Sequence, residues 1–143
     1  MRFIPEDIVA PWAYLLNDNY ANLSTATSWQ KVEKFRSFLA VFALGANGAT
    51  SITFKIQQAK DVLGSSAKDL ANQSYTLANP ATTHRLIVFR FISSDLDTAN
   101  GYRTVRLRLE VTGGTSTYVS GVLYGCDPIE GSAWTNKIVE VLN

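Results

Sequence analysis

The chain has 143 residues, enough for one domain with a two-layer core, and only 17% of them are charged. Its thirteen basic residues nearly balance twelve acidic ones, which argues against direct binding to nucleic acid. The longest apolar run, residues 38–44, is far shorter than the roughly 20 residues that span a bilayer, and the first residues lack the pattern of a signal peptide, so we expect no membrane association.

Residues 1–30 combine chain-breaking residues with large apolar side chains. Pro5, Pro11 and two polar runs interrupt any long period. Disordered tails are poor in aromatic residues. We therefore expect an N-terminal arm of residues 1–30 with little regular structure, which packs on its own domain or on a neighbouring subunit. The side chains available for this contact are Trp12, Tyr14, Leu15, Leu16, Tyr20 and Trp29.

Two strands are predicted on either side of Asn47-Gly48. Residues 32–44 are apolar on both alternations, which favours a central strand covered on both sides over a helix. Residues 51–57 alternate, with Ile52, Phe54 and Ile56 on one face. The Asn-Gly pair is typical of tight hairpin turns, in which both positions take a positive φ. A hairpin is therefore expected here.

The rest of the chain continues as strands separated by turns. After a Gly-Ser-Ser loop, residues 74–77 are predicted as a short edge strand, followed by strands over residues 84–93, 102–112 and 117–124. The third of these has the clearest pattern, with Val105, Leu107, Leu109 and Val111 on one side and Thr104, Arg106, Arg108 and Glu110 on the other. Six or seven short strands with regular turns indicate an all-β antiparallel sandwich or barrel over residues 31–125.

Residues 126–143 return to irregular character after Cys126-Asp127-Pro128. Trp134 and the apolar run at residues 138–142 predict a second ordered arm at the C-terminal end. The expected organisation is thus a β-domain with an extended arm at each end.

No constellation of residues in the sequence supports catalysis, a cofactor or a metal. The only histidine, His84, and the only cysteine, Cys126, could form a catalytic pair, but a polar surface position is the more common place for such a histidine. One cysteine and one histidine cannot supply a zinc site, and a lone cysteine excludes an internal disulfide. The run from Asp95 to Gly101 resembles a calcium loop but lacks the fifth-position ligand and the closing glutamate, so a polar turn is expected.

Arginines are the one notable charge feature. Arg103, Arg106 and Arg108, with Arg85 and Arg90, would form a basic patch if their strands adjoined, and arginine forks often bind carboxylates where subunits meet. An ordinary solvated sheet face is the alternative.

Three motifs resemble a family of small tailed-phage proteins encoded among virion genes. They are Lys55-Ile56-Gln57-x-Ala59-x-Asp61, Tyr102-Arg103-x-Val105-Arg106-Leu107 and Ser120-x-Val122-Leu123-x-Gly125, in this order along residues 35–125. The resemblance implies a β-sandwich virion component, for which the jelly roll is a candidate topology, attached to the head or near the neck. It implies no catalytic residues.

We therefore expect a non-enzymatic structural protein of a bacteriophage particle: a capsid decoration or cement protein, or another minor virion protein. It would be made in the host cytoplasm, bind major capsid or connector proteins and form a homo-oligomer. The expected interface residues are Trp12, Tyr14, Leu15, Leu16, Tyr20, Arg106, Arg108 and Trp134. The alternative is a carbohydrate-binding β-sandwich module, in which Trp29, Tyr118, Tyr124 or Trp134 would stack on sugars.

Overall fold

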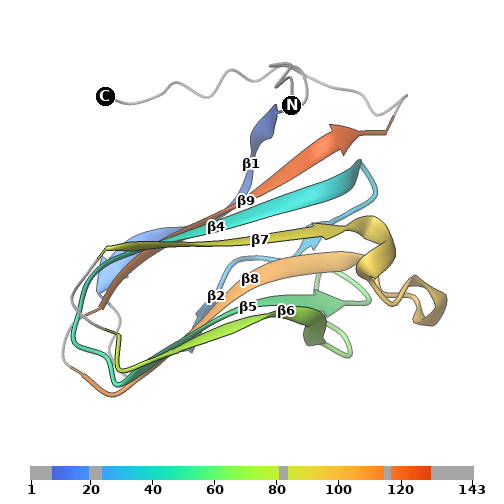
Figure 1. Ribbon diagram of the computed structural model, residues 1–143. Helices are drawn as coiled ribbons and strands as arrows, with labels where there is room; N and C mark the ends of the chain where they lie inside the picture. Colours follow the sequence, from blue (N-terminus) through green and yellow to red (C-terminus); the bar gives the residue numbers. More distant parts are fainter. Residues whose placement is uncertain (1–7, 20–23, 81–83, 115–116, 130–143) are drawn as a thin grey trace.

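A computed structural model describes residues 8–19, 24–80, 84–114 and 117–129, with only the backbone described for 8–19. These residues form two antiparallel sheets packed face to face (Figure 1). The strands are β1 (Ile8–Asn19), β2 (Ser24–Ala26), β3 (Gln30–Lys31), β4 (Phe35–Asn47), β5 (Ser51–Ala59), β6 (Lys68–Ala78), β7 (Arg85–Ile92), β8 (Thr104–Thr112) and β9 (Thr117–Pro128). Two short 3-10 helices, η2 (Ser93–Asp95) and η3 (Thr98–Asn100), join β7 to β8.

The strand order is that of a jelly roll. Sheet A has the order β1-β9-β4-β7, and sheet B has the order β2-β8-β5-β6, with β3 also paired to β8. The chain crosses between the sheets at most connections and stays within sheet B between β2 and β3 and at the β5–β6 hairpin. The antiparallel sandwich expected from the strand pattern is therefore confirmed, and its topology is the jelly roll.

The core lies between the sheets, where alternate residues of each strand point inward. On β8, Val105, Leu107, Leu109 and Val111 are buried while Arg106, Arg108 and Glu110 are half-buried on the other side, as their alternation predicts. The facing side chains of sheet A include a cluster of aromatic rings. Phe42 contacts Phe54 of sheet B with ring centroids 5.2 Å apart, and it contacts Phe89 of β7 edge-on.

The hairpin predicted at Asn47-Gly48 is wrong. β4 pairs with β7 and β9 in sheet A, whereas β5 pairs with β6 and β8 in sheet B, so this turn carries the chain from one sheet to the other. Neither Asn47 nor Gly48 has the positive φ of a tight hairpin. The Gly48 carbonyl instead lies against Gly114, where a side chain would clash, so the two crossovers at this end pack backbone to backbone.

The arm predicted for residues 1–30 is corrected over most of its length. β1 pairs with β9 at the edge of sheet A, while β2 and β3 pair with β8 in sheet B. Proline and asparagine residues hid this strand from a periodicity argument, and its pairing has three register irregularities. At the other end of the chain, β9 continues to Pro128. Residues 1–7, 20–23 and 130–143 lie outside the described residues.

Candidate functional site

One outer face of the sandwich is apolar. We define the sheet A outer face as the outward side chains of β4, β7 and β9. On β4 the buried inward residues alternate with half-buried outward ones, so this strand is covered on one side and not on both as predicted. The face consists of Ser37, Leu39, Val41, Ala43, Leu86, Val88, Arg90, Ile92, Tyr118, Ser120, Val122, Tyr124 and Cys126.

The register makes the face continuous. Val41 lies between Val88 and Val122, and in the next row Leu39 lies between Arg90 and Tyr124. The most exposed apolar side chains are Leu86 (71%), Val88 (52%), Ile92 (49%) and Tyr118 (44%). Single exposed apolar residues are ordinary, whereas a contiguous group makes this face a candidate binding surface.

Arg90 is the charged member of this face among its described side chains. Its charge acts on Cys126, a free half-buried thiol of the same face. Burial raises the pKa of the Cys126 thiol, and the positive charge of Arg90 offsets this only in part. The thiol therefore stays protonated at neutral pH and is a poor nucleophile.

The outer face of sheet B has the opposite character. The Lys55 ammonium lies 3.2 Å from carboxylate oxygens of both Asp69 and Glu110. Glu110 also accepts a hydrogen bond from Arg108 Nε at 2.9 Å, and Asp69 accepts one from Gln57 Nε2 at 2.8 Å. Every charge in this cluster faces an opposite charge of the same sheet.

This network alters the ionisation of its members. Burial lowers the pKa of Lys55, but hydrogen bonds to Glu110 and Asp69 outweigh it, and the pKa is raised. Burial raises the pKa of Asp69, but hydrogen bonds from Gln57 and Lys55 outweigh it, and the pKa is lowered. The hydrogen bond from Arg108 is the main cause of the lowered pKa of Glu110. All three groups are charged at neutral pH.

Trp29 packs at the border of the same face. The Arg106 guanidinium lies 4.3 Å from the ring centroid, and its Nε and one terminal nitrogen donate to Gln57 Oε1 at 3.0 and 2.8 Å. Gly64 lies against the edge of the indole, where a side chain would clash. Neighbours of the same chain thus hold this ring on one face and one edge.

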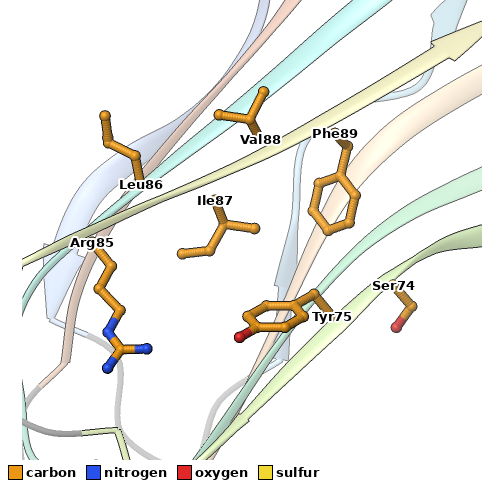
Figure 2. Close-up of a pocket in the computed structure, with 7 residues that line it drawn as sticks. All are labelled: Ser74, Tyr75, Arg85, Leu86, Ile87, Val88 and Phe89. Carbon is orange, nitrogen blue, oxygen red and sulfur yellow. The ribbon is translucent and has the colours of Figure 1, made fainter.

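A cleft opens between the edge strands β6 and β7. It has a volume of about 510 Å³ and is lined by Ser74, Tyr75 and residues 85–89. Figure 2 shows the Tyr75 ring directed towards Ile87 and Phe89, with Arg85 at one end of the opening and Leu86 and Val88 on the other side of β7. Apart from Arg85, its lining is neutral, without a titratable pair suited to catalysis.

The expected interface residues fall in different places. Trp12, Tyr14, Leu15 and Leu16 belong to β1, whose side chains are not described, and Tyr20 and Trp134 lie outside the described residues. Arg106 and Arg108 lie on the sheet B outer face, engaged as above. The single basic patch is wrong, because Arg85 and Arg90 belong to sheet A and Arg106 and Arg108 to sheet B.

The structure also places the residues that the sequence offered for catalysis and for calcium binding. Arg85 is paired with Leu44 and Cys126 with Ser37, so His84 and Cys126 lie near opposite ends of β4 and cannot form a catalytic pair. In the turn at residues 95–101, Asp97 pairs with Lys68 at 2.6 Å, and Asp95 accepts from the Ile92 N–H. Among the described residues no cluster of metal-ligating side chains occurs, and no helix is long and apolar enough to cross a membrane.

Sequence reasoning missed the sheet A outer face, although a signal for it exists. The second apolar alternation of residues 38–44 was interpreted as burial on both sides, and it is in fact the half-buried centre of this face. Leu86 and Val88 give a similar signal, since they are apolar at positions where a solvated strand would have polar residues.

No protein-family model and no curated protein matches the chain. Among solved structures, it is similar to CBM28, a carbohydrate-binding module specific for non-crystalline cellulose, with a TM-score of 0.50 and 8% identity over 82% of this chain and 72% of that one. A CBM4 structure gives a TM-score of 0.44 at 18% identity, covering 73% of this chain and 61% of the other. A structure of Broad Bean Stain Virus gives a TM-score of 0.43 at 12% identity, covering 71% of this chain and 58% of the other. The chain thus spans about three fifths of the last two. At these identities the similarities concern the fold alone.

Proposed function

We propose that the protein is a non-enzymatic structural subunit of a bacteriophage particle, a capsid decoration or other minor virion protein that binds neighbouring subunits through the sheet A outer face. The observation that carries the binding surface is the exposed apolar row of Leu86, Val88 and Ile92 beside Val41 and Leu39. The assignment to a phage particle is supported by the three sequence motifs.

The physical argument rests on the apolar area of the sheet A outer face that is exposed to water. Each Å² of this face that a partner removes from water contributes about 25 cal/mol, before the costs of association are subtracted. The pairing of β7 with β4 is regular, so the backbone of this face is ordered before binding and mainly side-chain freedom is lost when the face is covered. A flat, preorganised face of this kind fits the surface of another folded subunit better than a small molecule.

The experiment compares lysine substitutions on the two outer faces. Ile92→Lys with Tyr118→Lys charges the sheet A outer face, and Thr76→Lys with Thr112→Lys adds the same charge to exposed positions of sheet B. Each full-length variant is added to particles that lack the protein, and the bound fraction is measured by sedimentation. We expect the first variant to lose at least about tenfold in affinity, because two apolar side chains of the face are replaced by charged ones that a partner would have to desolvate, and the second to bind as the natural chain does. Equal binding by both variants would contradict the proposal.

The second candidate is a carbohydrate-binding module, and one observation keeps it in view: Trp29 lies half-buried beside the polar side chains Arg106 and Gln57. Sugars stack on exposed aromatic faces, and here Arg106 already covers one face of the ring. A glycan screen with the full chain discriminates the two functions. Sugar binding that Trp29→Ala abolishes and the lysine variants retain would favour this second function.

A further inference from the structure

The free edge of β7 is a regular, uncapped strand edge. Sheet A ends at β7, and within the described part of the chain no strand lies beyond it. Its pairing with β4 runs without irregularity from Arg85 opposite Leu44 to Ile92 opposite Ser37. An unpaired edge of this kind presents a row of N–H and C=O groups that can pair with another strand.

Two hydrogen bonds show which peptide groups of β7 point outward. The Arg90 carbonyl accepts from Gln73 Nε2 at 3.2 Å, and the Ile92 N–H donates to Asp95 Oδ2 at 2.8 Å. Peptide groups alternate in direction along a strand, so those of Leu86 and Val88 also point away from β4. No strand or side chain of the described residues caps the N–H groups of Leu86, Val88 and Arg90.

The other sheet edges are protected in ways that β7 is not. β6 has Asn72 at a φ of 60°, a register irregularity opposite residues 55–57 and two charged residues at its start. β1 is irregular along its length, and β2 and β3 have three and two residues. Bulges, charges and short edge strands are the usual defences against edge pairing. β7 also has two charged residues, Arg85 and Arg90, but it lacks a bulge and is eight residues long.

We propose that β7 pairs antiparallel with β7 of a second copy of this chain, about a two-fold axis through Val88. The three uncapped N–H groups lie at residues 86, 88 and 90, a set that is symmetric about Val88. In this register Val88 faces the second copy's Val88, and Leu86 faces the second copy's Arg90. The Val88 pair can exchange both of its N–H···O bonds. In the Leu86–Arg90 pairs the Arg90 carbonyl, which already accepts from Gln73 Nε2, would accept the Leu86 N–H through its second lone pair. This interface is separate from the attachment of the chain to a particle and does not depend on it.

This register fits better than registers centred on Phe89 or Arg90. On the inner side Ile87 would face the second copy's Phe89, and Arg85 would face Phe91, so no two like charges lie opposite each other. An axis through Arg90 would place that residue against itself, which is unfavourable for directly opposed like charges. An axis through Phe89 would require the Ile92 N–H, which Asp95 already holds.

The pairing also closes the cleft beside β7. The 510 Å³ opening lined by Tyr75, Ile87 and Phe89 would face the same opening of the second copy across the axis. The exposed ring of Tyr75 would then be covered. The two outer faces of sheet A would become one continuous surface.

The first test uses a charge pair at Leu86 in the full chain. Leu86→Arg and Leu86→Glu remove the same apolar side chain, but arginine would face the second copy's Arg90 and glutamate would pair with it. By sedimentation velocity we expect a dimer for the natural chain, a dissociation constant at least about tenfold higher for Leu86→Arg, and one within about threefold for Leu86→Glu. A natural chain that stays monomeric, or equal weakening by both variants, would overturn the proposal.

The second test fixes the register. In an antiparallel hydrogen-bonded pair the Cα atoms are about 5.5 Å apart, a distance that a disulfide spans. In a Cys126→Ser background, Val88→Cys should give a disulfide-linked dimer under mild oxidation, whereas Val41→Cys, in the middle of the same face, should not. Cross-linking at both positions would indicate face-to-face contact and overturn the edge pairing. A monomer in which the Leu86 and Val88 amides resist hydrogen exchange would assign the edge to another segment of the chain, which would also overturn it.

Discussion

The two outer faces of this sandwich differ in where their side chains find partners. On sheet B, Lys55, Asp69, Arg108 and Glu110 bind one another. On sheet A, the side chains around Val41 and Val88 are apolar and have solvent above them. The outward side chains of sheet B therefore stabilise the chain itself. The outward residues of sheet A have no such partners among the described side chains, which is why we propose that assembly uses this face.

The comparison of the two outer faces requires that the inner sides of both sheets form one buried core. The substitution with the largest expected effect on stability tests this. Leu107→Asp places a charge among fully buried side chains without a partner, which should cost more than about 4 kcal/mol and abolish folding. Thr112→Asp, at an exposed position of the same strand, should fold normally. Circular dichroism and urea unfolding measure both variants. Equal damage would show that the two sides of β8 are wrongly assigned.

A smaller loss of stability is expected when one side-chain contact on the outer face of sheet B is removed. Arg106→Ala removes the stacking on Trp29 and the two hydrogen bonds to Gln57. We expect a decrease of about 1 kcal/mol in the free energy of unfolding, measured in urea. Arg106→Lys keeps the charge but loses the planar guanidinium fork. Its free energy of unfolding should therefore lie between those of the natural chain and the alanine variant. No loss with alanine would mean that this face does not stabilise the chain.

The acidic residues of sheet B predict a pH dependence. Folding lowers the pKa of both Asp69 and Glu110, so their contribution is complete above the pKa of about 4 of the unfolded carboxyls and is lost as the pH falls through the lower folded values. The melting temperature should therefore decrease as the pH is lowered below about 4. Asp69→Asn with Glu110→Gln should lower it at pH 7 and flatten this decrease. An unchanged acid slope in the double variant would contradict the role of the network.

The smallest effect on stability is expected on sheet A. Ile92→Thr replaces an exposed β-branched side chain with another of similar shape, away from the uncapped part of β7. The free energy of unfolding should change by less than about 0.5 kcal/mol, as for most surface substitutions, although binding to particles should weaken. A loss as large as that of Arg106→Ala would mean that this face supports the fold after all.

Strands with one polar side could be predicted from the sequence, and the pairing between strands could not. The alternation at residues 104–112 located β8 and its inward side, because period 2 is a local property of the chain. The partner of β4 was predicted wrongly at Asn47-Gly48, because a short turn can close a hairpin or cross between sheets. Which of these occurs depends on strands distant in the sequence.

The N-terminal strand shows a second limit. β1 contains Pro11 and three register irregularities, so it has no clean period, and the contacts that order it come from β9 at the other end of the chain. The same limit applies to the candidate site. Apolar residues at outward positions of β4 and β7 look like core residues until the sheet order shows that no described strand covers them. Only the two-layer architecture distinguishes an interface from a core.

The central claim is that the chain assembles through the sheet A outer face, and hydroxyl-radical footprinting of free and particle-bound protein tests it most directly. Val62 and Leu63, exposed in the loop before β6, are internal controls away from this face. We predict that oxidation of Leu86, Val88, Ile92 and Tyr118 decreases several-fold on binding, while Val62 and Leu63 react as before. Protection of Leu63 with unchanged reactivity at Ile92 and Tyr118 would contradict the account.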